Sequence, residues 1–147
     1  MLNPAVERAI LERIKRIPIV ETLKMRLDEL DQGLCKVTVP YEPKYDGVFE
    51  SLHGGLLMTV ADSAACFAIM TQTGPDEVLT TTDMNIRFLA PCLSDVTAVA
   101  KVIKLGRTLC PVSVDLFDRS GILVAVAQVN YIRLAKIPKG GRSVFLP

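Results

Sequence analysis

The sequence predicts an α+β protein in which an antiparallel sheet wraps around one long central helix. Two observations carry this prediction. The segment LLMTVADSAACFAIMTQ contains no Pro or Gly and is rich in Ala, Leu and Met, which is typical of one helix that is buried on nearly every side. The rest of the chain is largely strand-like, with two extended segments before the helix and four after it. A helix that is apolar nearly all round needs cover, and a sheet supplies it.

The first element is predicted to be a helix beginning at Pro4, because Pro is favoured in the first turn of a helix. Four apolar residues recur at helical spacing, opposite the charged residues: Val6, Ile10, Ile14 and Ile17. Pro18 is expected to end the helix. Residues 1–20 are therefore predicted to form an N-terminal helix whose apolar stripe makes it a lid or a packing element.

Six segments are predicted to be strands: residues 21–29, 34–40, 78–89, 96–105, 108–117 and 122–134. Gly33 and Gly121 lie in the turns after the first and fifth strands, where hairpins favour Gly. The last four strands follow one another through links of hairpin length. The sheet and central helix are expected to fill residues 21–135, and residues 136–147 are expected to form a C-terminal extension.

The chain is nearly neutral overall, with 17 Lys and Arg residues against 16 Asp and Glu residues in 147. General nucleic-acid binding usually leaves a basic footprint, so this class of function is not expected. The charge is nevertheless uneven: 8 basic and 13 acidic residues lie up to Asp83, and 9 basic and 3 acidic residues follow it. A basic second half fits an anionic small molecule, and a solvated basic surface explains it equally well.

The four cysteines are widely spaced, without a CxxC pair or a neighbouring His, so no metal or other cofactor is expected. Charges interrupt the first twenty residues every few positions, which argues against a signal peptide. The most apolar stretch, Gly54–Met70, is interrupted by Asp62 and is short for a membrane span. A soluble, reduced, cytoplasmic protein without a membrane partner is the expectation.

The start of the central helix has the composition of a binding site for a carbonyl group. His53 precedes Gly54 and Gly55 there, where backbone N–H groups lack helical partners and the positive end of the helix dipole lies. Glycines let a ligand approach the backbone closely, and a carbonyl oxygen docked on these amides would be polarised. For His53 we favour a role in fixing the loop by hydrogen bonding over acid–base catalysis.

Asp62 lies nine residues after His53 and is the only charged residue between Glu50 and Asp76. A carboxylate among apolar side chains is costly unless it is paired or used chemically. Its position therefore favours a general base or a nucleophile. The alternative is a structural Asp that is paired with a buried Arg or a backbone amide.

The segment YDGVFESLHGGLLMTVADSAACFA, with TTTDMNIRFLAP and KLGRTL after it, resembles the hotdog-fold acyl-CoA thioesterases of the phenylacetate-degradation (PaaI-like) type. The resemblance spans roughly residues 22–134, and the expected order of elements agrees with the hotdog fold. It implies hydrolysis of an acyl-CoA thioester without a cofactor. It also implies a homo-oligomer, either a dimer or a tetramer of two dimers, with sites between subunits.

The resemblance also implies roles for individual residues. The helical acid that acts as general base or nucleophile falls on Asp62, and the amide that polarises the thioester carbonyl falls on Gly54, with His53 and Gly55 beside it. A hydroxyl that helps to hold the water falls on Thr81. The candidates for binding the coenzyme are basic residues of the later strands and loops: Arg87, Lys104 and Arg107.

The sequence departs from the family pattern at one place. Six residues before His53, where the family usually has Asn or Gln, the chain has Gly47. Either a shift of the loop substitutes Asp46 or Glu50 for the missing side chain, or the geometry of the reaction is altered. This departure keeps a second hypothesis open, a non-catalytic or regulatory domain that binds acyl-CoA. A hydratase of the same fold fits poorly, because it would need a catalytic His paired with an Asp further along, and the single His lies beside the two glycines.

Overall fold

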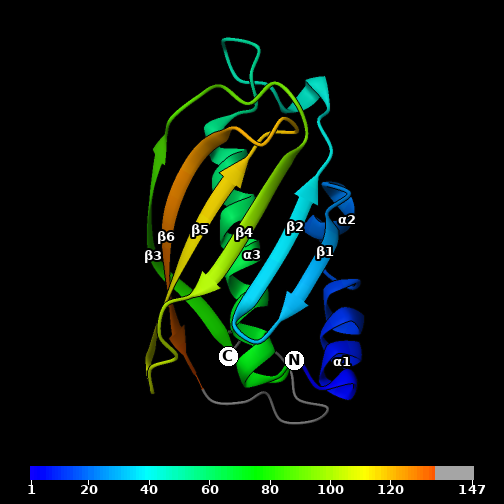
Figure 1. The fold of residues 1–147 in the computed structure, drawn as a ribbon, viewed down its shortest axis with the longest axis vertical. Helices are drawn as coiled ribbons and strands as arrows, with labels where there is room; N and C mark the ends of the chain where they lie inside the picture. Colours follow the sequence, from blue (N-terminus) through cyan, green and yellow to red (C-terminus); the bar gives the residue numbers. More distant parts are fainter. Residues whose placement is uncertain (135–147) are drawn as a thin grey trace, which may run out of the picture.

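A computed structural model describes residues 1–134, in which a curved six-stranded sheet surrounds one long helix (Figure 1). The strands are β1 (Arg26–Asp31), β2 (Leu34–Val39), β3 (Leu79–Phe88), β4 (Val96–Val102), β5 (Leu109–Phe117) and β6 (Leu123–Arg133). They pair antiparallel in the order β1-β2-β4-β5-β6-β3. The fold is the hotdog fold, which confirms the fold class predicted from the sequence.

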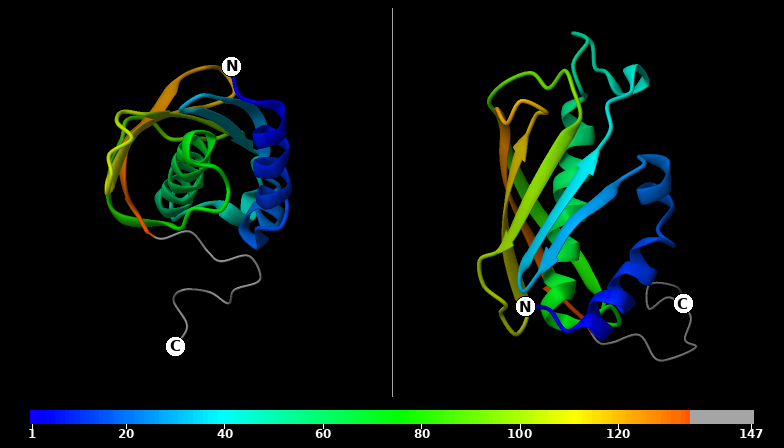
Figure 2. Two further views of the ribbon diagram at one scale, coloured as in Figure 1. Left: turned by 90° about the horizontal axis from the view of Figure 1, so that it is seen from below. Right: turned by 45° about the vertical axis from the view of Figure 1, so that its right-hand side comes forward.

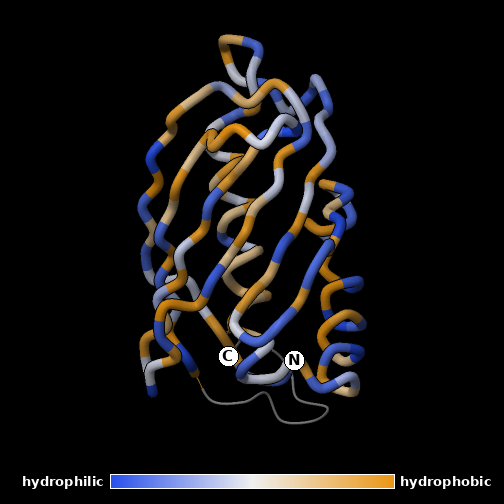
Figure 3. Tube along the Cα trace, viewed as in Figure 1, coloured by the Kyte–Doolittle hydropathy of each residue, from blue (hydrophilic) through white to orange (hydrophobic). Residues whose placement is uncertain are grey.

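The central helix α3 (Gly54–Thr73) lies in the hollow of the sheet and packs against β2, β4, β5 and β6 (Figure 2). The helix is rich in Ala, Leu and Met and carries apolar residues on almost every side (Figure 3). At 20 residues the helix is long and apolar enough to cross a membrane. It is longer than the apolar stretch Gly54–Met70, which by itself is short for a membrane span. Over half of it is buried against the rest of the chain, as is usual for the core helix of a soluble domain.

The N-terminal region differs from the sequence prediction. Helix α1 (Pro4–Ile14) ends before Pro18, and Pro18 begins a second short helix, α2 (Pro18–Thr22). Pro is well suited to the first position of a helix, so here it starts an element instead of ending one. The predicted first strand therefore begins five residues late, at Arg26. The stripe on α1 is confirmed as a packing face, because Ile10 and Ile14 are buried in the same core as α3.

The order of the strands corrects one of the three links of hairpin length that were predicted between the last four strands, the link between β3 and β4. β3 lies at one edge of the sheet beside β6, whereas β4 lies between β2 and β5. The chain from Leu89 to Asp95 is therefore a crossover at one end of the sheet, not a hairpin. A short link suffices because the sheet curls around α3 and brings its edge round (Figure 1). This placement leaves β3 as an open edge beside the helix.

Candidate active site

The first turn of α3 has one backbone N–H group free for a ligand. His53 caps the helix, and its Nδ1 accepts a hydrogen bond of 2.9 Å from the Gly55 N–H. This bond places the proton of a neutral imidazole on Nε2. Within residues 1–134 no acceptor is hydrogen-bonded to the Gly54 N–H. Of the two glycines, Gly54 is therefore the one that offers a donor at the positive end of the helix dipole.

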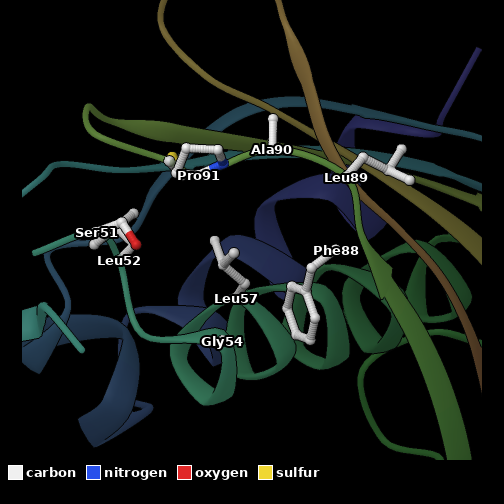
Figure 4. A pocket seen from close by; sticks show the side chains of 9 residues that line it. Ser51, Leu52, Gly54, Leu57, Phe88, Leu89, Ala90 and Pro91 are labelled. Carbon is white, nitrogen blue, oxygen red and sulfur yellow. The ribbon is translucent and has the colours of Figure 1, made fainter. Parts of the chain in front are cut away.

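A hollow of about 470 Å³ opens beside Gly54 (Figure 4). Its walls come from the loop before α3, from the first turns of α3 and from the crossover after β3, and they include Leu52, Leu57, Phe88, Ala90 and Pro91. The Phe88 ring lies so close to Gly54 that an added Cβ would be 3.0 Å from the ring. The free N–H group therefore lies at the rim of a largely apolar space.

The two carboxylate oxygens of Asp62, the sequence-predicted acid, are bound differently. Its Oδ1 accepts hydrogen bonds from the hydroxyls of Thr81, at 2.7 Å, and Tyr131, at 2.8 Å. In the described part of the chain, no group donates to Oδ2 and no cation forms a salt bridge with this carboxylate. Thr81, which the resemblance assigns to holding water, is thus bonded to the acid itself. The half-buried carboxylate keeps one oxygen available as a base or nucleophile.

The groups around Asp62 are neutral at physiological pH. Burial raises the pKa of the Cys66 thiol, one turn further along α3, to about 12, and the Asp62 charge raises it further. Burial, Cys66 and Asp62 also raise the pKa of the Tyr131 hydroxyl far above its usual value. Both groups therefore keep their protons, and Tyr131 acts only as a neutral donor toward the carboxylate.

Gly54 and Asp62 lie on the same helix but cannot serve the same carbonyl within one chain. Eight residues separate them, which at 1.5 Å per residue is about 12 Å along the helix axis. A nucleophile and an oxyanion donor must both approach one reacting carbonyl group, each within about 3 Å. A site that used both groups on one carbonyl would therefore have to combine Gly54 from one copy of the chain with Asp62 from another.

The loop before α3 holds the position at which the sequence departs from the family pattern. The Gly47 N–H donates a hydrogen bond to the Ser51 carbonyl, and the Gly47 carbonyl accepts one from the Glu50 N–H. A Cβ at Gly47 would be 3.6 Å from the His53 ring, which is an ordinary van der Waals contact. Asp46 accepts a hydrogen bond of 2.7 Å from Tyr41 through Oδ2, and its buried Oδ1 has no hydrogen-bond partner among residues 1–134. Glu50 is exposed and has a positive φ of 55°.

Two of the three predicted cations lie far from Gly54 within one chain, and the third, Arg87, directly precedes Phe88 in β3. Arg87 is on the exposed face of β3, and its guanidinium donates to the Ile86 carbonyl. Lys104 and Arg107 are exposed in the link between β4 and β5, at the opposite end of the sheet from the start of α3 (Figure 1). Residues 1–134 contain no group of three His, Cys, Asp or Glu side chains placed to hold a metal ion.

The thioesterase superfamily model matches residues 49–125, which span the loop tip, α3 and the strands up to the start of β6. The match covers more than half of the chain and includes the free N–H of Gly54 and the Asp62 carboxylate. The chain belongs to the thioesterase superfamily.

Relatives of known name support this membership. The chain is 34% identical over 126 residues to mouse acyl-coenzyme A thioesterase 13, covering 80% of this chain and 87% of the mouse protein. The match to the human protein of that name is also 34% identical but shorter, covering 63% of this chain and 66% of the human protein. The solved structure of the Escherichia coli PaaI protein, from the phenylacetic acid degradation operon, superposes with a TM-score of 0.84 at 20% identity, covering 92% of this chain and 98% of that one.

One residue that contacts Asp62 was not predicted from the sequence. Tyr131 lies in β6, and its hydroxyl reaches Asp62 only because β6 pairs with β3 and places Tyr131 opposite Thr81. The sequence shows Tyr131 as one apolar position of a strand and gives no pairing register. The only signal was that it is one of three Tyr residues in the chain and the only one in the second half.

Proposed function

We propose that this chain is an acyl-CoA thioesterase of the PaaI-like type, which hydrolyses an acyl-CoA thioester to a free acid and coenzyme A. The observation that carries the proposal is the Asp62 carboxylate, held through Oδ1 by two hydroxyls while Oδ2 stays unbonded. The names of the mouse and human relatives support a coenzyme A thioester as substrate.

In this mechanism the thioester carbonyl oxygen accepts a hydrogen bond from the Gly54 N–H. Asp62 Oδ2 then either takes a proton from water, so that hydroxide adds to the carbonyl carbon, or adds to that carbon itself to give a mixed anhydride. In both routes the C–S bond breaks and coenzyme A leaves as a thiolate, which takes up a proton. Water then opens the anhydride in the second route. Both routes need the same donor and the same acid.

The proposed enzyme is a homodimer, or a tetramer of two dimers, joined through β3. Along this open edge strand, Thr81 touches Asp62 and Phe88 touches Gly54. Antiparallel pairing of β3 with a second copy, centred between Met84 and Asn85, sets Thr81 opposite the partner's Phe88. It thereby brings Asp62 beside the partner's Gly54 and covers the open edge.

The proposed position of the substrate follows from the same arrangement. The acyl group enters the apolar hollow beside Gly54, where Phe88 limits its size. The coenzyme's phosphates bind to exposed cations on the later strands and loops, for which Arg87, Lys104 and Arg107 remain the candidates. All four cysteines are free, which supports a reducing cytoplasmic location.

The test is release of free coenzyme A from a panel of short, long and aromatic acyl-CoA thioesters, compared between the unaltered protein and Asp62→Asn. The Asn carbonyl oxygen still accepts from Thr81 and Tyr131, so the fold is expected to keep its melting temperature. The rate is expected to fall by about 10²–10⁴ because the basic oxygen is lost. Full activity in a folded Asp62→Asn variant would exclude this mechanism.

A second function, binding of acyl-CoA without hydrolysis, is favoured by the missing side chain at Gly47. Saturable binding of the thioesters by calorimetry, with no release of coenzyme A from any of them, would establish it in place of the enzyme.

A further inference from the structure

Two side chains of the sheet bind one oxygen of the Asp62 carboxylate and leave the other oxygen without a hydrogen bond from residues 1–134. Both hydrogen bonds to the carboxylate end on Oδ1, and they come from two different strands that lie on the same side of α3. A carboxylate bound through one oxygen cannot rotate freely, so its second oxygen is held in a fixed direction. Orientation of this kind is what a base or nucleophile needs before it meets a substrate.

The two donors are placed by strand pairing. Thr81 in β3 and Tyr131 in β6 are directly opposite each other in the antiparallel ladder. A β-bulge follows Thr81, because Thr82 has no partner and Asp83 pairs with Asn130. On the outer face, the Asn130 amide donates to both Asp83 oxygens, at 3.0 and 3.1 Å, and the Thr82 hydroxyl donates to the Asn130 carbonyl at 3.1 Å. These bonds fix the bulge, and bulges of this kind re-aim a side chain.

Tyr131 has the properties of a permanent donor. Only 4% of its surface is exposed, and its hydroxyl lies 2.8 Å from both Asp62 Oδ1 and the Asp62 carbonyl oxygen. Its single proton therefore ties the Asp62 side chain to the helix backbone. The charged or titratable groups around Asp62 are Tyr131 on β6, Cys66 on α3 and, acting on Cys66 from α1, Arg13. Hydroxyl donors orient the carboxylate and leave its negative charge in place, whereas a paired Arg or Lys would cancel that charge.

We propose that Tyr131 is a positioning residue for the thioesterase reaction, which acts with Thr81 to hold Asp62 Oδ1 and so presents Oδ2 to the substrate. The proposal rests on the proposed acyl-CoA hydrolysis. It adds a residue that has no part in the roles assigned from the resemblance. It also explains why β3 carries a bulge beside Thr81.

The experiment compares Tyr131→Phe, Thr81→Val and the double variant with the unaltered protein in coenzyme A release. Thr38→Val is the matched control, because its hydroxyl also donates to a carboxylate, Asp28 Oδ2 at 2.5 Å, but on β2 and β1 away from the site. Each single variant is expected to lower kcat by roughly tenfold to a hundredfold, the size of one hydrogen bond to a charged group, with KM nearly unchanged. The double variant is expected to lose more than the product of the single losses, because either hydroxyl alone still restrains the carboxylate.

A measurement without substrate separates this inference from the proposed function. The chemical shift of a carboxyl carbon depends on the hydrogen bonds that its oxygens accept, so loss of the bond from Tyr131 to Asp62 Oδ1 should change it. At one fixed pH, the Asp62 carboxyl carbon signal in ¹³C NMR, assigned with Asp62→Asn, is expected to shift in Tyr131→Phe and to stay in place in Thr38→Val. An unshifted signal together with unchanged kcat in a folded Tyr131→Phe variant would overturn the positioning role. Absence of turnover in the unaltered protein would overturn the proposed function and, with it, the role of Tyr131 in catalysis.

Discussion

Replacement of Gly54 by Pro removes the proposed oxyanion donor with little other change to the helix. Gly54 is the first residue of α3, where Pro is favoured, and its N–H makes no hydrogen bond in the described chain that folding would lose. His53 before it has a ψ of 132°, within the range that a residue preceding Pro adopts. The helix is therefore expected to form in Gly54→Pro much as it does in the unaltered protein.

The matched control is Gly54→Ala, which adds a Cβ at the same place but keeps the N–H. In both variants this Cβ meets the Phe88 ring at 3.0 Å, and the 52% exposed ring has room to turn away. The ratio of their kcat values therefore reports the replacement of the N–H hydrogen by the Cδ of the Pro ring. Loss of one oxyanion donor costs about 10²–10³ in kcat, or about 2.7–4 kcal/mol, so we expect Gly54→Pro to be slower than Gly54→Ala by that factor. Equal kcat values in the two variants, with circular dichroism showing the same helix content, would refute the role of Gly54.

Three further predictions concern charge and thiols. If exposed cations bind the coenzyme phosphates, the KM for acyl-CoA should rise with salt while kcat changes little, and the rise should be smaller in Arg107→Ala. A KM that responds neither to salt nor to this substitution would argue against the site. Burial raises the pKa of Asp28, but hydrogen bonds from Thr38 and Arg26 outweigh it and hold the pKa below its usual value. The ionised Asp28 therefore stabilises the fold at pH values above the usual pKa of Asp, and this stabilisation is lost as pH falls through the lowered pKa. Between about pH 5 and pH 3 the melting temperature of Asp28→Asn should therefore fall less than that of the unaltered protein, and an equal fall would contradict the assignment. Burial raises the pKa of Cys35 and Cys66, so these thiols should react slowly with a disulfide reagent near pH ~8 until the protein is unfolded. Rapid reaction of both thiols in the native protein would contradict this prediction.

The sequence predicted those parts of the structure that depend on local pattern. The long apolar composition of α3 and the isolated charge at Asp62 were visible in the residues, and both lie where they were expected. The capping role favoured for His53 agrees with its hydrogen bond to the Gly55 N–H. Local signals sufficed in these cases because each depends on neighbours a few residues away along the chain.

Features of the structure that depend on contacts between distant parts of the chain were either not predicted or predicted wrongly. Pro18 ends a helix or starts one according to what the next residues pack against, so Pro18 was predicted to end the N-terminal helix, and the last two residues of α2 were predicted as the start of a strand. The β3–β4 crossover and the role of Tyr131 follow from the pairing of β3 with β6, whose register joins residues about fifty positions apart. The difference between Gly54 and Gly55 depends on the rotamer of His53, which a sequence does not give.

Mixing of two inactive variants tests the shared site most directly. Gly54→Pro and Asp62→Asn subunits are unfolded together, refolded at equal amounts and assayed for coenzyme A release beside each variant alone. If Gly54 of one subunit works with Asp62 of its partner, each mixed dimer has one intact site and one that lacks both groups. Random pairing then predicts about a quarter of the unaltered activity, since half the dimers are mixed and each has one of its two sites intact. If both groups act within one chain, every site in the mixture lacks one of them, and activity no higher than that of the separate variants would contradict the shared site.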